Sequence, residues 1–331
     1  MKRRDTLGAA VALGAAVLPF AAQGETPEKV RRVGVLMGFA ESDTEAQARL
    51  AIFKKTLGGL GWSEGRNLRI ETRWSAGDVS RAAVFAKELV AFQPDVILSS
   101  TTPATAALQR ETASIPIIFT VVSDPVGSGF VKALAHPGRN ITGFINIEAS
   151  LAEKWLELLK EVAPRVNQVA VMFNPETATS AEYYLQPLRV AASKLGVTMH
   201  PSMVRSDPEI DAAIALLGQQ PRSGLIAMAD SFLFLHRKVV IAASARHKVP
   251  AVYPASYWGV GGGLIAYGVD VVDLFRRAAP YVDRILRGAS VAELPVQQPT
   301  RFELAVNRGT AKALGLTIPR SLLLRADEVI E

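Results

Sequence analysis

The sequence contains no cysteine among its 331 residues. Disulfide bridges, thiol catalysis, iron–sulfur clusters and cysteine-based zinc sites are therefore excluded. Histidine is also scarce, since the chain has only His136, His200, His236 and His247, and none of them falls in an HxxxH or HExxH spacing. A catalytic metal centre needs such clustered ligands. We therefore predict neither a bound metal nor any other cofactor.

Blocks of like charge are missing as well. The 37 Lys and Arg residues against 31 Asp and Glu give a formal net charge of +6, which is spread along the chain. A mild excess of this kind affects solubility and the steering of ligands, but it is not the concentrated basic surface of a nucleic-acid-binding protein. No nucleic-acid partner is expected. The proportions of hydrophobic residues (49%) and charged residues (21%) are those of a folded globular protein.

One long uncharged run, residues 7–22, follows Lys2, Arg3 and Arg4 near the N-terminus. It is shorter than the ~20 residues that a membrane-spanning helix needs. A positive start, an apolar centre and small residues at the end are typical of a signal peptide, and the Arg pair resembles the twin-arginine form. We expect residues 1–24 to be such a peptide, cleaved near residues 22–25, and the mature protein to be periplasmic. Because no cysteine follows the cleavage site, we do not expect a lipoprotein; an uncleaved anchor is the alternative.

Beyond residue 30, short β-branched runs alternate with amphipathic stretches. This alternation predicts an α/β fold whose parallel strands are buried on both faces. A long helix is predicted over residues 271–287. The predicted strands are residues 33–38, 68–73, 95–99, 117–122, 141–146, 168–173, 197–200, 224–229, 250–253, 263–267 and 302–306.

The two halves of the chain follow one plan. The strand that begins at Val33 and the strand that begins at Val169 each precede a predicted helix that ends in Leu-Gly. This weak internal repeat predicts two Rossmann-like lobes, each a parallel sheet flanked by helices, hinged around a central cleft. We assign residues 25–147 together with about 271–331 to the first lobe, and residues 148–270 to the second.

Polar residues gather where the predicted strands end. In open α/β sheets, ligands bind beyond the carboxyl ends of the strands and beside helix N-termini. Hydroxyls and helix-terminal N–H groups suit a carboxylate, and Asp124 or Asp230 could accept hydrogen bonds from an ammonium. Ser, Thr, Asp and Asn at such positions are also typical helix N-cap or turn residues. The candidate ligand-binding residues at these positions are Phe39, Thr101, Thr102, Ser123, Asp124, Asn174, Asp230 and Tyr257.

Several motifs stand in order along the chain. They include Val33-Gly-Val-Leu-Met, Leu60-Gly-Trp62-x-Glu64-Gly65, Asp124-Pro125-Val126-Gly127-Ser-Gly129, Pro137-Gly138-x-Asn140 and Pro299-Thr300-x-Phe302-Glu303. From about residue 31 to residue 331, the sequence resembles the ABC transporter substrate-binding proteins of the TrpX-like group, which have the type I periplasmic binding protein fold. Many members are lipoproteins, and this chain departs from them in having no cysteine.

The resemblance implies a hinged, monomeric binder that closes on a small ligand and hands it to an inner-membrane ABC permease with its ATPase. In some members the ligand is an amino acid, so an amino acid or related carboxylate, aromatic or branched, is expected. By position, the resemblance implies first-lobe contacts near Phe39, Thr101, Thr102, Ser123 and Asp124, and second-lobe contacts near Asn174, Asp230 and Tyr267.

Two other functions remain open on the sequence. An exported α/β enzyme acting on a similar small molecule would need a base in the cleft, which Asp124 or Asp230 would have to supply; no GxSxG or GxxxxGK[ST] motif is present, and we predict no catalytic residue. A periplasmic receptor for a sensor protein would bind its ligand in the same way and differ only in its partner. A sugar-sensing repressor is excluded, because the predicted signal peptide stands where its DNA-binding helices would be.

Overall fold

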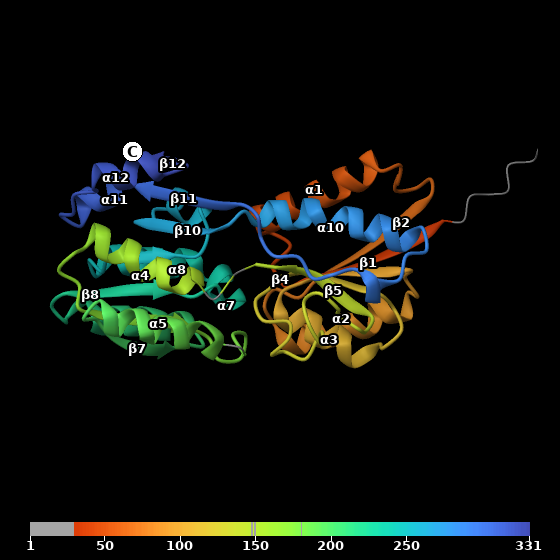
Figure 1. Ribbon diagram of the computed structural model, residues 1–331, viewed down its shortest axis with the longest axis horizontal. Helices are drawn as coiled ribbons and strands as arrows, with labels where there is room; N and C mark the ends of the chain where they lie inside the picture. The colour runs from red at the N-terminus through yellow and green to blue at the C-terminus, as the bar shows by residue number, and fades with distance from the viewer. Residues whose placement is uncertain (1–29, 147, 149, 180) are drawn as a thin grey trace, which may run out of the picture.

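Each of the two lobes is built on its own sheet of mainly parallel strands (Figure 1). The computed structural model describes residues 30–146, 148, 150–179 and 181–331, so the predicted signal peptide lies outside the described residues. Among the helices of these residues, none has the length and apolar character to cross a membrane.

The first lobe contains a five-stranded sheet in the order β2-β1-β3-β4-β5, with all neighbours parallel. β1, β3, β4 and β5 are almost entirely buried, as their continuous apolar sequences predict. Helices α1 and α10 cover one face and α2 and α3 the other (Figure 1). The elements are β1 (Arg31–Met37), α1 (Thr44–Gly59), β2 (Leu68–Trp74), α2 (Val79–Ala91), β3 (Val96–Ser100), α3 (Thr102–Glu111), β4 (Ile117–Val122), β5 (Ile141–Ile145), α10 (Val271–Leu286) and the 3₁₀ helix η1 (Val291–Glu293).

The second lobe contains a seven-stranded sheet in the order β12-β11-β10-β9-β8-β6-β7. Its run β7-β6-β8-β9-β10 repeats the strand order of the first lobe, so the internal repeat predicted from the sequence is confirmed. The elements are α4 (Ser150–Val162), β6 (Gln168–Phe173), α5 (Glu182–Lys194), β7 (Thr198–Met203), α6 (Asp207–Gly218), β8 (Ser223–Ala227), α7 (Ser231–Leu235), α8 (Arg237–Arg246), β9 (Ala251–Tyr253), α9 (Tyr257–Val260), β10 (Ile265–Val269), β11 (Phe302–Asn307), α11 (Arg308–Ala313), α12 (Arg320–Arg325) and β12 (Glu328–Ile330).

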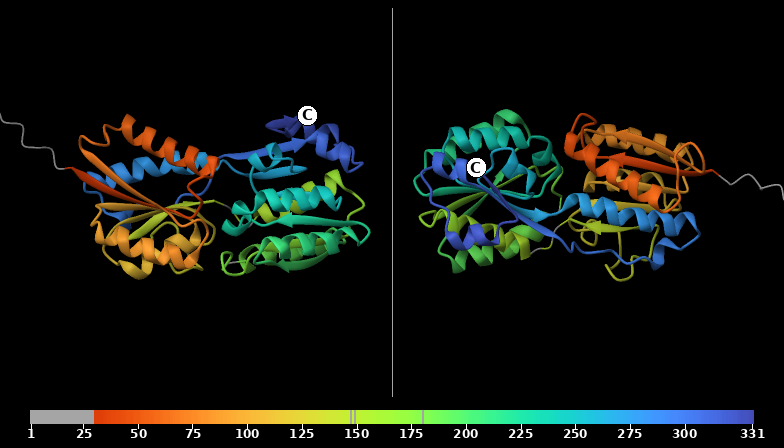
Figure 2. Two further views of the ribbon diagram at one scale, coloured as in Figure 1. Left: turned by 180° about the vertical axis from the view of Figure 1, so that it is seen from behind. Right: turned by 90° about the horizontal axis from the view of Figure 1, so that it is seen from above.

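The end of the chain corrects the predicted lobe assignment. Helix α10 packs against α1 in the first lobe, but β11 then pairs antiparallel with β10, and β12 pairs with β11 (Figure 2). Residues 302–331 therefore belong to the second lobe, although the sequence assigned them to the first. The physical reason is that β10 would otherwise leave its outer backbone N–H and C=O groups unpaired at the edge of the sheet.

The chain crosses between the lobes after β5, after β10 and after η1. Two of these crossings are hydrogen-bonded to each other, because the backbone N–H of Gln297 donates to Gly143 O (2.8 Å) and the N–H of Ile145 donates to Gln297 O (3.0 Å). The third crossing joins them where the N–H of Asp270 donates to Arg301 O (3.1 Å). The described parts of the three crossing segments are therefore hydrogen-bonded to one another.

We expect Gly143→Ala to destabilise the first lobe. A Cβ atom at this position in β5 would lie 2.1 Å from the backbone oxygen of Phe119 in β4, so the two strands would have to separate. The expected loss in the free energy of unfolding is about 3 kcal/mol, which lowers the melting temperature by roughly 6–12 °C. Differential scanning calorimetry measures this change.

Gly58→Ala is the matched control, because Gly58 lies in α1 and a Cβ atom there would meet no other atom within 4 Å. Alanine favours a helix interior over glycine, so this variant should melt at the wild-type temperature or above it. Equal melting temperatures for Gly143→Ala and the wild type would contradict the packing argument.

Candidate functional site

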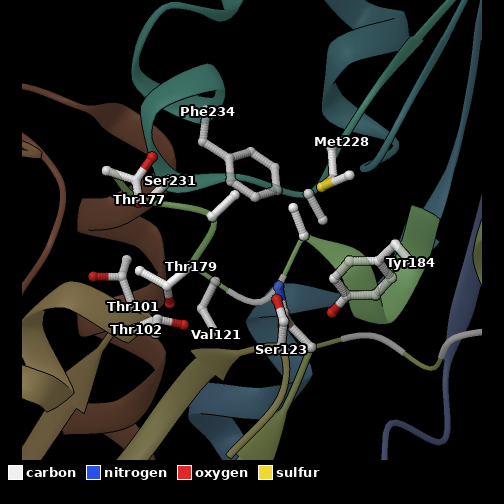
Figure 3. A pocket seen from close by; sticks show the side chains of 14 residues that line it. Thr101, Thr102, Val121, Ser123, Thr177, Thr179, Tyr184, Met228, Ser231 and Phe234 are labelled. Atoms are coloured by element: carbon white, nitrogen blue, oxygen red, sulfur yellow. The ribbon is translucent and has the colours of Figure 1, made fainter. Parts of the chain in front are cut away.

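A small cavity lies between the lobes, at the carboxyl ends of strands from both sheets, and side chains of both lobes point into it (Figure 3). It encloses about 20 Å³, the space of about one water molecule. The lining residues are Thr101, Thr102, Val121, Ser123 and Asn146 of the first lobe and Thr177, Ala178, Thr179, Ala181, Tyr184, Met228, Ala229, Ser231 and Phe234 of the second. None of these side chains carries a charge at neutral pH.

Thr101, which ends β3 and precedes α3, has a strained backbone. Its φ angle is +91°, which a β-branched residue rarely adopts. Its side chain faces Gly38 so closely that a Cβ atom on Gly38 would lie 2.2 Å from Thr101 Oγ1. The Thr101 side chain makes no capping hydrogen bond to α3. The Thr101 N–H donates to Thr120 O (3.0 Å) and Pro103 has no N–H, so Thr102 and Ala104 carry the N–H groups that the start of this helix leaves without a side-chain cap.

Val121 in β4 is strained in the same way, with a φ angle of +56°. The pairing of β4 with β5 shifts between Thr120 and Val122, so Val121 forms an irregularity that turns the end of the strand. Residues in such conformations cost about 1–3 kcal/mol each and cluster at functional sites. Two strained β-branched residues in one cavity wall therefore mark this cavity as the candidate site.

Two buried hydroxyls of the second lobe, those of Tyr184 and Ser231, lack a hydrogen-bond partner among the described residues. Burial raises the pKa of the Tyr184 phenol well above its usual value, so this group stays neutral. The Ser123 hydroxyl across the cleft offsets part of this rise in pKa, but its geometry is not that of a hydrogen bond to the Tyr184 hydroxyl. An unpaired buried hydroxyl costs about 1–3 kcal/mol. A ligand that hydrogen-bonded to both groups would remove this cost.

Asp230 lies behind the cavity and holds two of its walls together. Its carboxylate accepts hydrogen bonds from the backbone N–H of Asn174 (2.8 Å), from the Thr177 hydroxyl and from the N–H of Phe232 (3.2 Å). Burial raises the pKa of Asp230 to about 6, and these hydrogen bonds offset part of the rise. Asp230 therefore fixes Thr177 and the start of α7, and it does not line the cavity.

Of the residues predicted from the sequence, Thr101, Thr102 and Ser123 line the cavity. The others lie elsewhere. Asp124 accepts a hydrogen bond from the N–H of Gly127 (2.7 Å), and Asn174 accepts one from the N–H of Glu176 (2.8 Å), so each stabilises its own turn. The rings of Phe39 and Tyr257 lie 6.5 Å and 6.4 Å from that of Phe234, outside the cavity, and the ring of Tyr267 stacks on Phe302.

Sequence reasoning did not select most of the second-lobe wall. Thr177 and Ser231 follow the ends of β6 and β8, so the same strand-end rule could have found them. Tyr184 and Phe234 come from helices α5 and α7, where an aromatic residue is typical of a packed core. No sequence signal distinguishes these two rings from core residues.

We expect Asp230→Asn to change how stability depends on pH. Because the pKa of Asp230 is about 6 in the folded protein and 3.8 ordinarily, the folded state binds the proton more tightly. The contribution of Asp230 to stability is therefore greatest below pH 4 and falls by about 3 kcal/mol as the pH rises to 7. The variant should lack this fall, so its stability relative to the wild type should increase from pH 4 to pH 7 in urea unfolding experiments. Asp78→Asn, which removes the same charge from an exposed N-cap, is the control, and a pH-independent difference for Asp230→Asn would contradict the assignment.

Comparison with known proteins identifies relatives of this chain. The family model described as ABC transporter substrate binding protein matches residues 33–330. A curated relative, the tyrosine-binding protein of Clostridioides difficile strain R20291, is 28% identical over 268 residues, which cover 80% of this chain and 75% of the relative.

Two solved structures of similar identity to this chain differ in their TM-scores. The ABC domain of Streptococcus pneumoniae in complex with L-Trp is 27% identical, has a TM-score of 0.83, and the match covers 91% of this chain and 99% of that one. The ligand-free, open structure of a substrate-binding protein with adhesive properties from Clostridium difficile is 26% identical with the same coverage, but its TM-score is 0.67. At nearly equal identity, the present chain is therefore more similar in its overall arrangement to the L-Trp complex than to the ligand-free, open structure. With the family match spanning almost all described residues and two lobes of the matching fold, the chain belongs to the ABC transporter substrate binding protein family and has the type I periplasmic binding protein fold.

Proposed function

We propose that the protein captures a neutral, aromatic amino acid between its lobes and delivers it to the permease and ATPase of an ABC importer. The observation that carries this proposal is the uncharged cavity, in which hydroxyl and amide groups of the first lobe face the aromatic and thioether side chains of the second. Such a site suits a ligand whose two charges cancel and whose side chain is apolar.

The first-lobe wall offers groups for the charged end of an amino acid. The N-terminus of α3, at Thr102, presents a backbone N–H and a positive dipole end, which suit a carboxylate. Asn146 Oδ1, which lies 3.2 Å from the Ser123 hydroxyl, can accept a hydrogen bond from an ammonium. The carboxylate and ammonium groups of the ligand would thereby be stabilised by the helix dipole and the side-chain amide rather than by charged side chains.

The second-lobe wall offers groups for an apolar side chain. The rings of Tyr184 and Phe234 and the thioether of Met228 line this side of the cavity (Figure 3). Aromatic rings and methionine sulfur pack well on aromatic ligands. The similarity to a tyrosine-binding protein and to a structure in complex with L-Trp supports the same ligand class.

The alternative of an exported enzyme finds no support at this site. The matched family consists of substrate-binding proteins and is not an enzyme family. The carboxylates that such an enzyme would need as a base, Asp124 and Asp230, do not line the cavity, and both accept hydrogen bonds from their own backbone surroundings.

The cavity of about 20 Å³ is too small for an amino acid. The lobes must therefore part for the ligand to enter, and the lining side chains must move outward to hold it. A ligand that bridges both lobes then shifts the balance toward the closed form by binding it more tightly than the open form. The permease would recognise the closed form. The predicted signal peptide supports export of the chain to the periplasm, where it would meet the permease.

We expect L-tyrosine and L-tryptophan to bind the mature chain, residues 25–331, in isothermal titration calorimetry. Lysine, arginine, glutamate and aspartate should bind at least ~100-fold more weakly, because their extra charge would be buried without a partner. The proposal would be contradicted if a charged amino acid bound more tightly than L-tyrosine and L-tryptophan, or if neither of these two bound.

We expect Tyr184→Phe to weaken binding of the preferred amino acid by about tenfold, the effect of one lost hydrogen bond in a buried site. The variant should be as stable as the wild type or more stable, because it removes a buried hydroxyl that lacks a partner. Tyr253→Phe, which alters a buried tyrosine outside the cavity, is the control and should bind normally. Unchanged affinity in Tyr184→Phe would show that its hydroxyl does not contact the ligand.

A further inference from the structure

A cluster of charged and aromatic side chains joins the lobes beside the cavity, and none of the ligand contacts proposed above accounts for it. We name it the interlobe cluster. Its first-lobe members are Phe39, Asp43 and Arg49, and its second-lobe members are Phe234, Arg237 and Tyr257. Of these six residues, only Phe234 also lines the cavity.

An ion pair forms the charged part of the cluster. Arg237 Nη1, at the start of α8, lies 2.6 Å from Oδ2 of Asp43, the N-cap of α1. The two side chains are only 16% and 8% exposed. Charge pairs shielded from water in this way are screened far less than surface pairs. Because one partner belongs to each lobe, this pair exists only when the lobes are closed.

Arg49 forms the second part of the cluster. This residue is 2% exposed, and its Nε atom has no hydrogen-bond partner among the residues that the structure describes. Its guanidinium carbon lies 4.9 Å from the centre of the Phe39 ring and 5.4 Å from that of Tyr257. A buried cation is costly unless other groups stabilise it, and aromatic faces do so. Phe39 and Arg49 both belong to the first lobe, whereas Tyr257 belongs to the second, so parting of the lobes would separate Tyr257 but not Phe39 from Arg49.

Phe234 connects the cluster with the cavity. Its ring contacts Phe39 at 6.5 Å and Tyr257 at 6.4 Å, and its backbone oxygen accepts a hydrogen bond from Arg237 (3.0 Å). Next to it, Leu235 packs so tightly on Gly77 of the first lobe that a Cβ atom there would lie 2.3 Å away. The closed cluster therefore holds one aromatic wall of the cavity in place.

We infer that Asp43, Arg49 and Arg237 are positioning residues that hold the lobes closed and thereby set ligand affinity without touching the ligand. The arrangement of this chain is nearer to that of the L-Trp complex than to that of the ligand-free, open structure, which favours an arrangement of this kind as the one that binds. Apparent affinity scales with the fraction of molecules in the binding-competent state. Loss of the cluster should therefore weaken every ligand by the same factor and leave selectivity unchanged.

Asp43→Asn tests the inference with little change in shape. The amide keeps an oxygen to cap the N–H groups of Glu45 and Ala46 in α1, and it removes the negative charge that faces Arg237. Asp211→Asn is the matched control, because Asp211 pairs with Arg246 (3.2 Å) of the same α8 helix but entirely within the second lobe. Arg237→Lys keeps the charge and should restore part of what Arg237→Gln loses.

The first measurement needs no ligand. Since the chain has no cysteine, spin labels can be placed at Lys87→Cys in α2 and Lys194→Cys in α5, one in each lobe. Without added amino acid, Asp43→Asn and Arg237→Gln should shift the interlobe distances toward longer values. Asp211→Asn should resemble the wild type, and Arg237→Lys should fall between the wild type and Arg237→Gln. Equal distance distributions for Asp43→Asn and the wild type would overturn the inference.

The second measurement rests on the proposed function and uses L-tyrosine and L-tryptophan as probes in calorimetry. Asp43→Asn should weaken both by about tenfold with their affinity ratio unchanged, and Asp211→Asn should weaken neither. The inferred role of the interlobe cluster in binding would be overturned if Asp43→Asn left either affinity unchanged, increased it, or reduced the two affinities by different factors. If neither amino acid binds the wild type, the proposed function fails, and the label distances still decide whether the cluster holds the lobes closed.

Discussion

The hydrogen bonds between the crossing segments are the constraint on which the rest of the molecule depends. The backbone of Gln297 donates to Gly143 O and accepts from the N–H of Ile145, both along one edge of β5, and the N–H of Asp270 in the crossing after β10 donates to Arg301 O. Because these segments are tied together, the lobes can rotate about them but cannot slide freely past one another. The carboxyl ends of both sheets therefore face each other whenever the lobes close, and the cavity lies where they meet.

The closed cleft combines groups that are unfavourable when taken singly. Thr101 and Val121 hold strained backbone angles, Tyr184 and Ser231 bury hydroxyls without partners, and Arg49 buries a positive charge. A fold retains such features only where the surrounding packing outweighs their cost. Here the large apolar cores of the two lobes supply that packing.

The sequence predicted most of the architecture, because buried parallel strands have a simple signature. Continuous β-branched runs located β1 to β6 and β8 to β11 to within a few residues, and the repeat anticipated the matching strand orders of the lobes. The lobe of residues 302–331 was assigned wrongly, since pairing of β11 with β10 is a contact across an intervening helix that no local pattern reveals.

The site was less predictable for a related reason. The strand-end rule selects loops, and it found Thr101, Thr102 and Ser123, but it cannot tell whether a polar group turns to the cavity or to its own backbone. Asp124 and Asp230 do the latter. Tyr184 and Phe234 have the opposite property: their helical spacing is that of core residues, and only the approach of the other lobe makes them walls of a cavity.

The return of the chain from α10 to β11 has a consequence for synthesis. Neither lobe is a continuous stretch of chain, since the first needs α10 and the second needs the last thirty or so residues. Until those residues leave the ribosome, β10 presents an open sheet edge, which is the kind of surface that pairs with other chains. The sheet of the second lobe therefore stays incomplete until residues 302–331 are synthesised. A chain that lacked these residues would keep an exposed sheet edge that can pair with other chains.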